Sequence, residues 1–296
     1  MGSLTPYLNQ GMALVINLSA ALVLFFVGRL LARRMAGLLL FFFFLGVPCQ
    51  ANGIGYQGTH ILTYRTMSGL ARAFTEKTGV TVAIRGGGCA DGVAAVRDKT
   101  MELGGMCCPP RKNELESLGL VAHAVARDIK VAVVNEVNPL RSITTRQLMD
   151  LHQGKITSWR ELGWRDKPVA LVFRVHCQDR DEPVRQYLGI QSDISNLTPK
   201  RIIVRTDQEL LDRVSSFPTA IGITSRVFAG ERRVKVLKLD GVIPSPEMVS
   251  RGSYPFTAPM FLVTDQKPVP DTVRFLEFVL GAAGQSIVMR NLGPKP

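Results

Sequence analysis

The chain has 296 residues, of which 46% are hydrophobic and 20% are charged, which is enough for a full core in one large or two modest domains. The 36 lysines and arginines outnumber the 24 acidic residues, which fits a basic solvent-exposed surface or attraction to an anionic ligand or membrane face. Because no run of arginines is interleaved with aromatic residues, the sequence argues against nucleic acid as a partner.

Residues 1–51 are expected to be a hydrophobic membrane or signal region. Two apolar runs, residues 12–27 and 36–47, flank three arginines. The second run has the length of a signal-peptide core, and small residues after it favour cleavage after Ala51. A transmembrane anchor without cleavage and a lipid anchor on Cys49 stay open as alternatives. In each case the rest of the chain is expected outside the cytoplasm, in the periplasm or an equivalent compartment.

The remaining sequence alternates between patterns typical of strands and of helices, which predicts an α/β fold with a mixed or parallel sheet. Residues 52–57 are expected to be a glycine-rich linker. The expected strands cover residues 60–64, 80–84, 121–126, 130–135, 169–175, 220–224 and 256–263. The expected helices cover residues 68–79, 93–99, 145–152, 208–215 and 271–290, and another begins near residue 181.

A glycine-rich turn joins the strand at residues 80–84 to the helix at residues 93–99. Its sequence is Arg85-Gly86-Gly87-Gly88-Cys89-Ala90-Asp91-Gly92. A strand, a glycine turn and a helix start together present backbone N–H groups to a ligand. A helix start also favours the thiolate form of Cys89. Asp91 is either a ligand contact or an acid that serves the helix start.

Several segments resemble the PstS-like, phosphate-binding branch of periplasmic substrate-binding proteins. The most specific is Gly154-Lys155-Ile156-Thr157-Ser158-Trp159. The order and spacing of such segments hold from about residue 60 to residue 293. The resemblance implies a binding protein that is not an enzyme. Such a protein captures a small ligand and passes it to a membrane transporter.

The resemblance also implies a two-lobed periplasmic-binding-protein fold of type II, with a ligand cleft between the lobes. Lobe one would comprise residues 58–136 plus 238–296, and lobe two would comprise residues 137–237. The strands that cross between the lobes are expected near residues 135–138 and 234–254.

The sequence departs from the family at the expected ligand site. Family members carry Gly-Ser-Thr-Thr after the first strand, a serine after the glycine triplet, and Ser-Asp or Ser-Arg after the third strand. This chain has residues 63–67, Cys89 and Cys107-Cys108 at these places. The candidate ligand-binding residues are therefore Arg65, Thr66, Gly88, Cys89, Asp91, Cys107, Cys108, Arg174, His176, Cys177, Gln178 and Asp179.

The thiols at this cleft leave three interpretations open. Because thiols are weak hydrogen-bond donors, the first is a cleft rebuilt for a soft metal ion or metal cofactor (zinc, copper or an iron–sulfur centre). Its ligands would be Cys89, Cys107, Cys108, Cys177 and His176. The second is a phosphate or oxyanion binder with disulfides near its cleft. The third is a thiol-based redox protein, although the sequence has no Cys-x-x-Cys motif.

Overall fold

The computed structural model describes residues 53–175, 183–191 and 193–296. The chain divides into a first unit, Met1–Gln50, and a second unit, Ala51–Pro296, and all described residues belong to the second unit. None of the helices in this described part is both long and apolar enough to cross a membrane. The expected hydrophobic region of residues 1–51 lies outside the described residues and stays a prediction.

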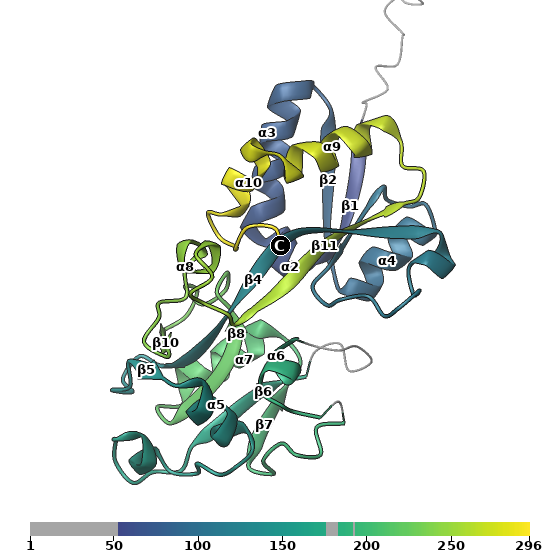
Figure 1. Cartoon of the computed structure of the whole chain (residues 1–296). Coiled ribbons are helices and arrows are strands. Elements are labelled where there is room, and N and C mark those ends of the chain that lie inside the picture. Colours follow the sequence, from purple (N-terminus) through teal and green to yellow (C-terminus); the bar gives the residue numbers. More distant parts are fainter. Residues whose placement is uncertain (1–52, 176–182, 192) are drawn as a thin grey trace, which may run out of the picture. The chain divides into compact units, whose positions relative to one another are not determined.

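Strands and helices alternate along the described chain, as Figure 1 shows. The strands are β1 (Gly53–Thr59), β2 (Thr81–Gly87), β3 (Leu103–Met106), β4 (Leu120–Asn135), β5 (Ser142–Ile143), β6 (Ala170–Arg174), β7 (Arg201–Val204), β8 (Ala220–Ser225), β9 (Val234–Val236), β10 (Lys238–Leu239) and β11 (Thr257–Asp265). The α-helices are α2 (His60–Leu62), α3 (Ser68–Thr78), α4 (Cys89–Arg97), α5 (Thr145–His152), α6 (Pro183–Tyr187), α7 (Asp207–Ser216), α8 (Pro246–Ser250), α9 (Pro270–Leu280) and α10 (Ala282–Val288).

Nine of the described strands form one mixed sheet, as the alternating pattern predicts. The hydrogen-bonded order is β2-β1-β3-β11-β4-β8-β6-β7, and β9 also pairs with β4. Strand β1 is parallel to β2 and β3, and β6 is parallel to β7 and β8. Strand β11 is antiparallel to β3 and β4, and β4 is antiparallel to β8.

The long strand β4 connects two buried hydrophobic clusters. Its first part, residues 120–129, pairs with β11, and its second part, residues 130–134, pairs with β8. The sequence predicts two separate strands here, at residues 121–126 and 130–135. The structure has one strand because the buried Asp128 carboxylate lies 2.8 Å from the Lys130 ammonium, and so the charge is paired inside the protein.

The two buried clusters meet near the middle of β4 and near the start of β11. The first cluster draws mostly on residues 54–126 and 260–292, and the second on residues 129–256. The mixed α/β fold with two clusters is consistent with a two-lobed binding protein. The lobe boundaries expected from the sequence stay a prediction, although residues 238–256 contribute to the second cluster and not the first.

Strand β1 shows that the prediction for the start of the folded unit is wrong. The sequence predicts a linker at residues 52–57 and a strand at residues 60–64, but Gly53–Thr59 is a largely buried strand between β2 and β3, and the next residues start a helix. A side chain at Gly58 would collide with the backbone of Gly105 on β3. The glycines that indicate a linker therefore allow close strand packing instead.

Candidate functional site

The C-terminal ends of β1, β2 and β3 bring three candidate segments to one edge of the sheet. The register places Thr59 beside Gly87 and Gly58 beside Gly105, so the three parallel strands end together. Open α/β sheets commonly hold ligands outside the carboxyl ends of their strands. This edge carries the glycine turn and the adjacent cysteines, and we call it the strand-end site.

Residues 85–87 of the predicted glycine turn end β2, Gly88 joins the two elements, and α4 begins at Cys89, earlier than the helix start predicted at residue 93. Gly88 has an extended backbone and precedes the first helical residue, Cys89, and the Asp91 carboxylate accepts a 2.7 Å hydrogen bond from the Gly88 N–H. Asp91 therefore serves the helix start. A side chain at Gly92 would press against the backbone of Gly105, so α4 packs tightly against the strands and its first turn stays at the strand-end site.

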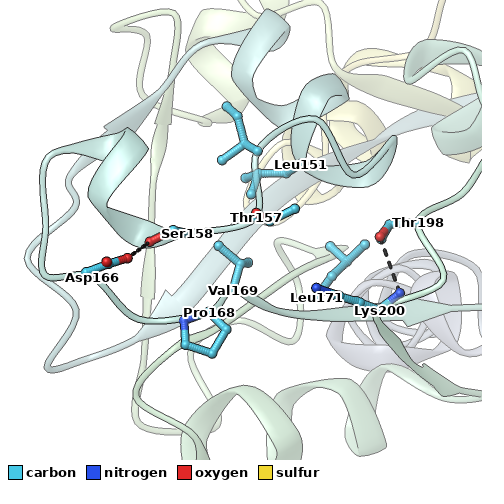
Figure 2. Close-up of a pocket in the computed structure, with 10 residues that line it drawn as sticks. Leu151, Thr157, Ser158, Asp166, Pro168, Val169, Leu171, Thr198 and Lys200 are labelled. Atoms are coloured by element: carbon cyan, nitrogen blue, oxygen red, sulfur yellow. Dashed lines mark hydrogen bonds between the residues drawn. The ribbon is translucent and has the colours of Figure 1, made fainter.

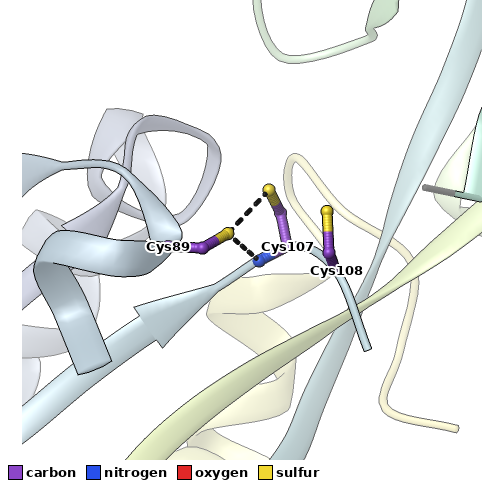
Figure 3. A group of neighbouring side chains, drawn as sticks. All are labelled: Cys89, Cys107 and Cys108. Atoms are coloured by element: carbon purple, nitrogen blue, oxygen red, sulfur yellow. Dashed lines mark hydrogen bonds between the residues drawn. The ribbon is translucent and has the colours of Figure 1, made fainter. Parts of the chain in front are cut away.

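Three cysteines converge at this site, as Figure 3 shows. The sulfurs of Cys89 and Cys107 lie 3.3 Å apart, and the Cys107 N–H donates a 3.1 Å hydrogen bond to the Cys89 sulfur. The Cys108 sulfur joins them, and all three sulfurs lie within 4.8 Å of one another. The 3.3 Å separation exceeds the length of a disulfide bond, about 2.05 Å. The other two predicted metal ligands, His176 and Cys177, lie outside the described residues.

Tyr56 packs beneath the strand-end site and is absent from the sequence-based candidates. Its side chain is fully buried, and its hydroxyl oxygen accepts a long 3.5 Å hydrogen bond from the Thr63 hydroxyl. Burial raises the pKa of Tyr56 well above its usual value, although the hydrogen bond from Thr63 opposes this shift. The phenol therefore stays protonated. The alternation of Ile54 and Tyr56 between small residues is the signal that could have identified this strand.

A pocket of about 490 Å³ adjoins the strand-end site. It is lined by His60, Thr63, Tyr64, Arg65, Thr206, Asp207, Gln208, Phe228 and Glu231. The rings of Tyr64 and Phe228 lie 5.3 Å apart, and a β-carbon at Gly86 would lie 3.5 Å from the His60 ring. His60 therefore links the pocket to the glycine turn, although the sequence places it in a strand and gives it no role in binding.

Arg65 lines this pocket, whereas Thr66 does not. Arg65 has φ 61° and ψ −31° inside a kinked π-helical turn over Thr63–Met67, and its guanidinium lies 5.2 Å from the centre of the Tyr64 ring. A non-glycine residue in this backbone region costs of order 1–3 kcal/mol, and such residues cluster at functional sites. The Thr66 side chain is fully buried, and its hydroxyl has no hydrogen-bond partner among the described residues.

Arg174 lies at the end of β6, as expected from the sequence. Its guanidinium forms a 3.3 Å ion pair with Asp207, which lines the pocket and accepts a 2.7 Å hydrogen bond from the Thr224 hydroxyl. Both charged side chains are nearly buried, so their positions are well fixed. The predicted site residues that follow this arginine, Gln178 and Asp179, lie outside the described residues.

The most specific family segment, Gly154 to Trp159, has a structural role. Thr157 and Ser158 line a separate pocket of about 260 Å³, shown in Figure 2 with Leu151 and Val169. The Ser158 hydroxyl donates a 2.7 Å hydrogen bond to Asp166, and the indole N–H of the fully buried Trp159 donates to the backbone carbonyl of Thr219 at 2.8 Å. Among the sequence-predicted site residues that the structure describes, none lines this pocket.

Comparison with known proteins identifies the family. The PBP superfamily domain matches residues 63–283. The chain is 25% identical over 263 residues to the phosphate-binding protein PstS of Bacillus subtilis, an alignment that covers 85% of this chain and 83% of the relative.

Solved structures of related proteins have the same fold. A putative phosphate ABC transporter substrate-binding protein from Clostridium perfringens, with bound phosphate, aligns with a TM-score of 0.69 and 26% identity, covering 83% of this chain and all of the other. An ABC-type phosphate transport receptor from Vibrio cholerae aligns with a TM-score of 0.62 and 20% identity, covering 82% of this chain and all of the other, which supports the fold alone. The chain therefore belongs to the PBP superfamily and is a PstS-like member of it.

Proposed function

We propose that this chain is an extracytoplasmic binding protein that captures phosphate or a related oxyanion and delivers it to an ABC transporter. The observation that carries the proposal is the family match, which spans residues of both buried clusters and includes a relative of 26% identity with bound phosphate. This function corresponds to the oxyanion interpretation of the sequence. The relatives do not support the alternative in which a metal is the transported ligand.

The strand-end site supplies backbone donors for an anion. The backbone N–H groups that follow Gly88 lie in the first turn of α4, where the helix dipole favours negative charge. The Gly88 N–H already donates a hydrogen bond to the Asp91 carboxylate, so the other backbone amides of the turn are the donors for the ligand. The fixed guanidinium of Arg174 supplies a charge-assisted contact from the second part of the sheet. Binding of this kind makes and breaks no covalent bond.

The pocket beside the strand-end site is lined by residues from two distant parts of the chain, so an anion bound there would contact both parts. Arg65 and His60 come from the chain after β1, and Asp207 and Phe228 come from the second half of the chain. We propose that a bound anion draws these two sets of residues together, which is the closure motion that two-lobed binding proteins use. The Asp207 carboxylate would then accept a hydrogen bond from a protonated oxyanion.

Calorimetric titration with inorganic phosphate tests this proposal. Replacing Arg174 by glutamine should weaken phosphate binding about ten- to hundredfold, because one charge-assisted hydrogen bond contributes about 1.5–3 kcal/mol. Arg165→Gln is the matched control, because the Arg165 guanidinium lies over Trp164, away from the site. An intact protein that shows no heat of binding at millimolar phosphate would overturn the proposal.

A further inference from the structure

We propose that Cys89, Cys107 and Cys108 form a binding site for a soft cation, Cu(I), held by three thiolates. This site goes beyond the capture of an oxyanion, because it depends on three buried sulfurs and on no residue of the pocket. The observation that carries it is the convergence of the three sulfurs within 4.8 Å, one from the start of α4 and two from the bend after β3.

The local backbone places the two adjacent cysteines on one side of the chain. In a regular strand, successive side chains point to opposite faces. Strand β3 ends at Met106, and the chain bends at Cys107 and Cys108 before two prolines. Figure 3 shows the Cys107 and Cys108 sulfurs on the same side, with Cys89 pointing toward them from α4. Pro109 and Pro110 restrict the following backbone, which holds this bend.

The sulfur positions are close to those of a metal–thiolate centre. A metal bound to three sulfurs at about 2.3 Å each requires sulfurs about 4.0 Å apart in a trigonal plane. The Cys89 and Cys107 sulfurs are 3.3 Å apart, and the other separations do not exceed 4.8 Å. Shifts of under about 1 Å, within reach of small side-chain rotations, would reach this geometry. A disulfide would use only two of the three sulfurs.

A soft metal binds the thiolate form of cysteine, so a position that is favourable for negative charge supports this site. Cys89 is the first residue of α4, where the helix dipole favours negative charge. The Cys107 N–H already donates a hydrogen bond to the Cys89 sulfur. Without a metal, three buried cysteines act as small hydrophobic side chains, and such packing does not require the sulfurs to meet at one point.

The donor set selects the metal. Within the described residues, the cluster consists of cysteines alone, with no histidine, aspartate or glutamate among its members. Soft thiolate donors favour Cu(I). The three cysteines are buried, with at most 3% of each residue exposed, so the sulfurs are shielded from water.

The test is an anaerobic titration of the full chain with Cu(I), in mild detergent, against a chromophoric Cu(I) chelator. We expect one equivalent of tightly bound copper. Cys89→Ser, Cys107→Ser and Cys108→Ser should each weaken copper binding at least a hundredfold. Met106→Leu is the matched control, because it changes the buried residue that precedes Cys107 and leaves the three thiols in place. This control should bind copper as the wild type does.

X-ray absorption on the copper-loaded wild type keeps the test decisive if a serine variant does not fold. We expect a shell of three sulfurs at about 2.3 Å. A shell that contains nitrogen or oxygen, wild-type copper affinity in a folded Cys89→Ser variant, or tighter binding of zinc than of Cu(I) would overturn the proposal. Phosphate titration of the metal-free protein is a separate measurement, so failure of the copper site would leave the proposed oxyanion function standing.

Discussion

The sulfur of Cys89 lies 3.3 Å from the sulfur of Cys107, although 18 positions separate the two residues in the sequence. Cys89 begins α4 after β2, and Cys107 follows β3, so the contact exists because both strands flank β1 and end at the same edge. The relatives match this chain across the whole fold and are named as phosphate-binding proteins. The thiols therefore lie where the fold brings its strand ends together.

Replacing Cys89 by serine should tighten phosphate binding about ten- to hundredfold. A hydroxyl is a much better hydrogen-bond donor than a thiol, and one bond to a charged group contributes about 1.5–3 kcal/mol. Cys89→Ala is the matched control, because it removes the sulfur without adding a donor, and its affinity should not rise. Calorimetry on both variants measures the effect. Equal phosphate affinities for the serine and alanine variants would show that residue 89 does not contact the anion.

Copper and phosphate should weaken each other's binding, if both bind as proposed. Three thiolates and one Cu(I) carry a net charge of −2, and this charge would lie beside the amides that hold the anion. Binding linkage is reciprocal, so the two affinities should change by the same factor. The measurement is a phosphate titration of copper-loaded and copper-free protein. A copper-loaded protein that binds phosphate more tightly would contradict the proposed position of the two sites.

The buried ion pair in β4 should be important for stability. Asp128→Asn should lower the free energy of unfolding by about 3–5 kcal/mol, because it removes the negative charge from one side of a buried ion pair. Asp98→Asn is the control, because Asp98 pairs with Arg97 on the surface, and such pairs contribute little. Urea unfolding measures both changes. Similar losses in the two variants would argue against a special role for the buried pair.

His152 should make the protein less stable in mild acid. Its ring is fully buried, and this burial lowers the pKa of His152 from 6.5 to about 4, although a hydrogen bond to the Leu148 carbonyl opposes the shift. At pH values between these two pKa values, the His152 ring is protonated in the unfolded chain and neutral in the folded chain. The stabilisation is therefore present above pH 6.5 and is lost as the pH falls toward 4, by roughly 3 kcal/mol in total.

Urea unfolding at pH 7 and pH 5 checks this dependence. The wild type should lose more stability between the two pH values than His152→Gln, which has no titrating ring at this position. The comparison concerns the difference between pH values, so a uniform loss of stability in the variant does not affect it. The same pH dependence in both proteins would show that another group causes the acid sensitivity.

The sequence predicts the parts of the fold that have regular periodicity. The strand predicted at residues 220–224 and the helix predicted at residues 208–215 match β8 and α7 closely. The prediction fails where packing decides the structure. The glycine-rich residues 52–57 predict a linker, but they lie in or beside β1, where glycine allows close strand contact. Two strands are predicted at residues 121–126 and 130–135, but β4 continues through both, with the Asp128–Lys130 ion pair buried inside it.

The candidate site is predictable only in part for a similar reason. The glycine turn and the cysteines stand out as motifs, and the structure brings Cys89 to Cys107 and Cys108. His60, Asp207 and Phe228 do not stand out, because common residue types in no motif become neighbours only when distant segments fold together. Cys177 lies outside the described residues, and its place at the cleft stays a prediction.

Hydrogen exchange measured by mass spectrometry, with and without phosphate, tests the central claim most directly, because it shows where the anion binds. The account predicts that phosphate slows exchange in peptides that cover the glycine turn and the start of α4, around Gly87 and Cys89. Peptides that line the separate pocket around Ser158 should not change. Protection around Ser158, with none at the glycine turn, would contradict the account.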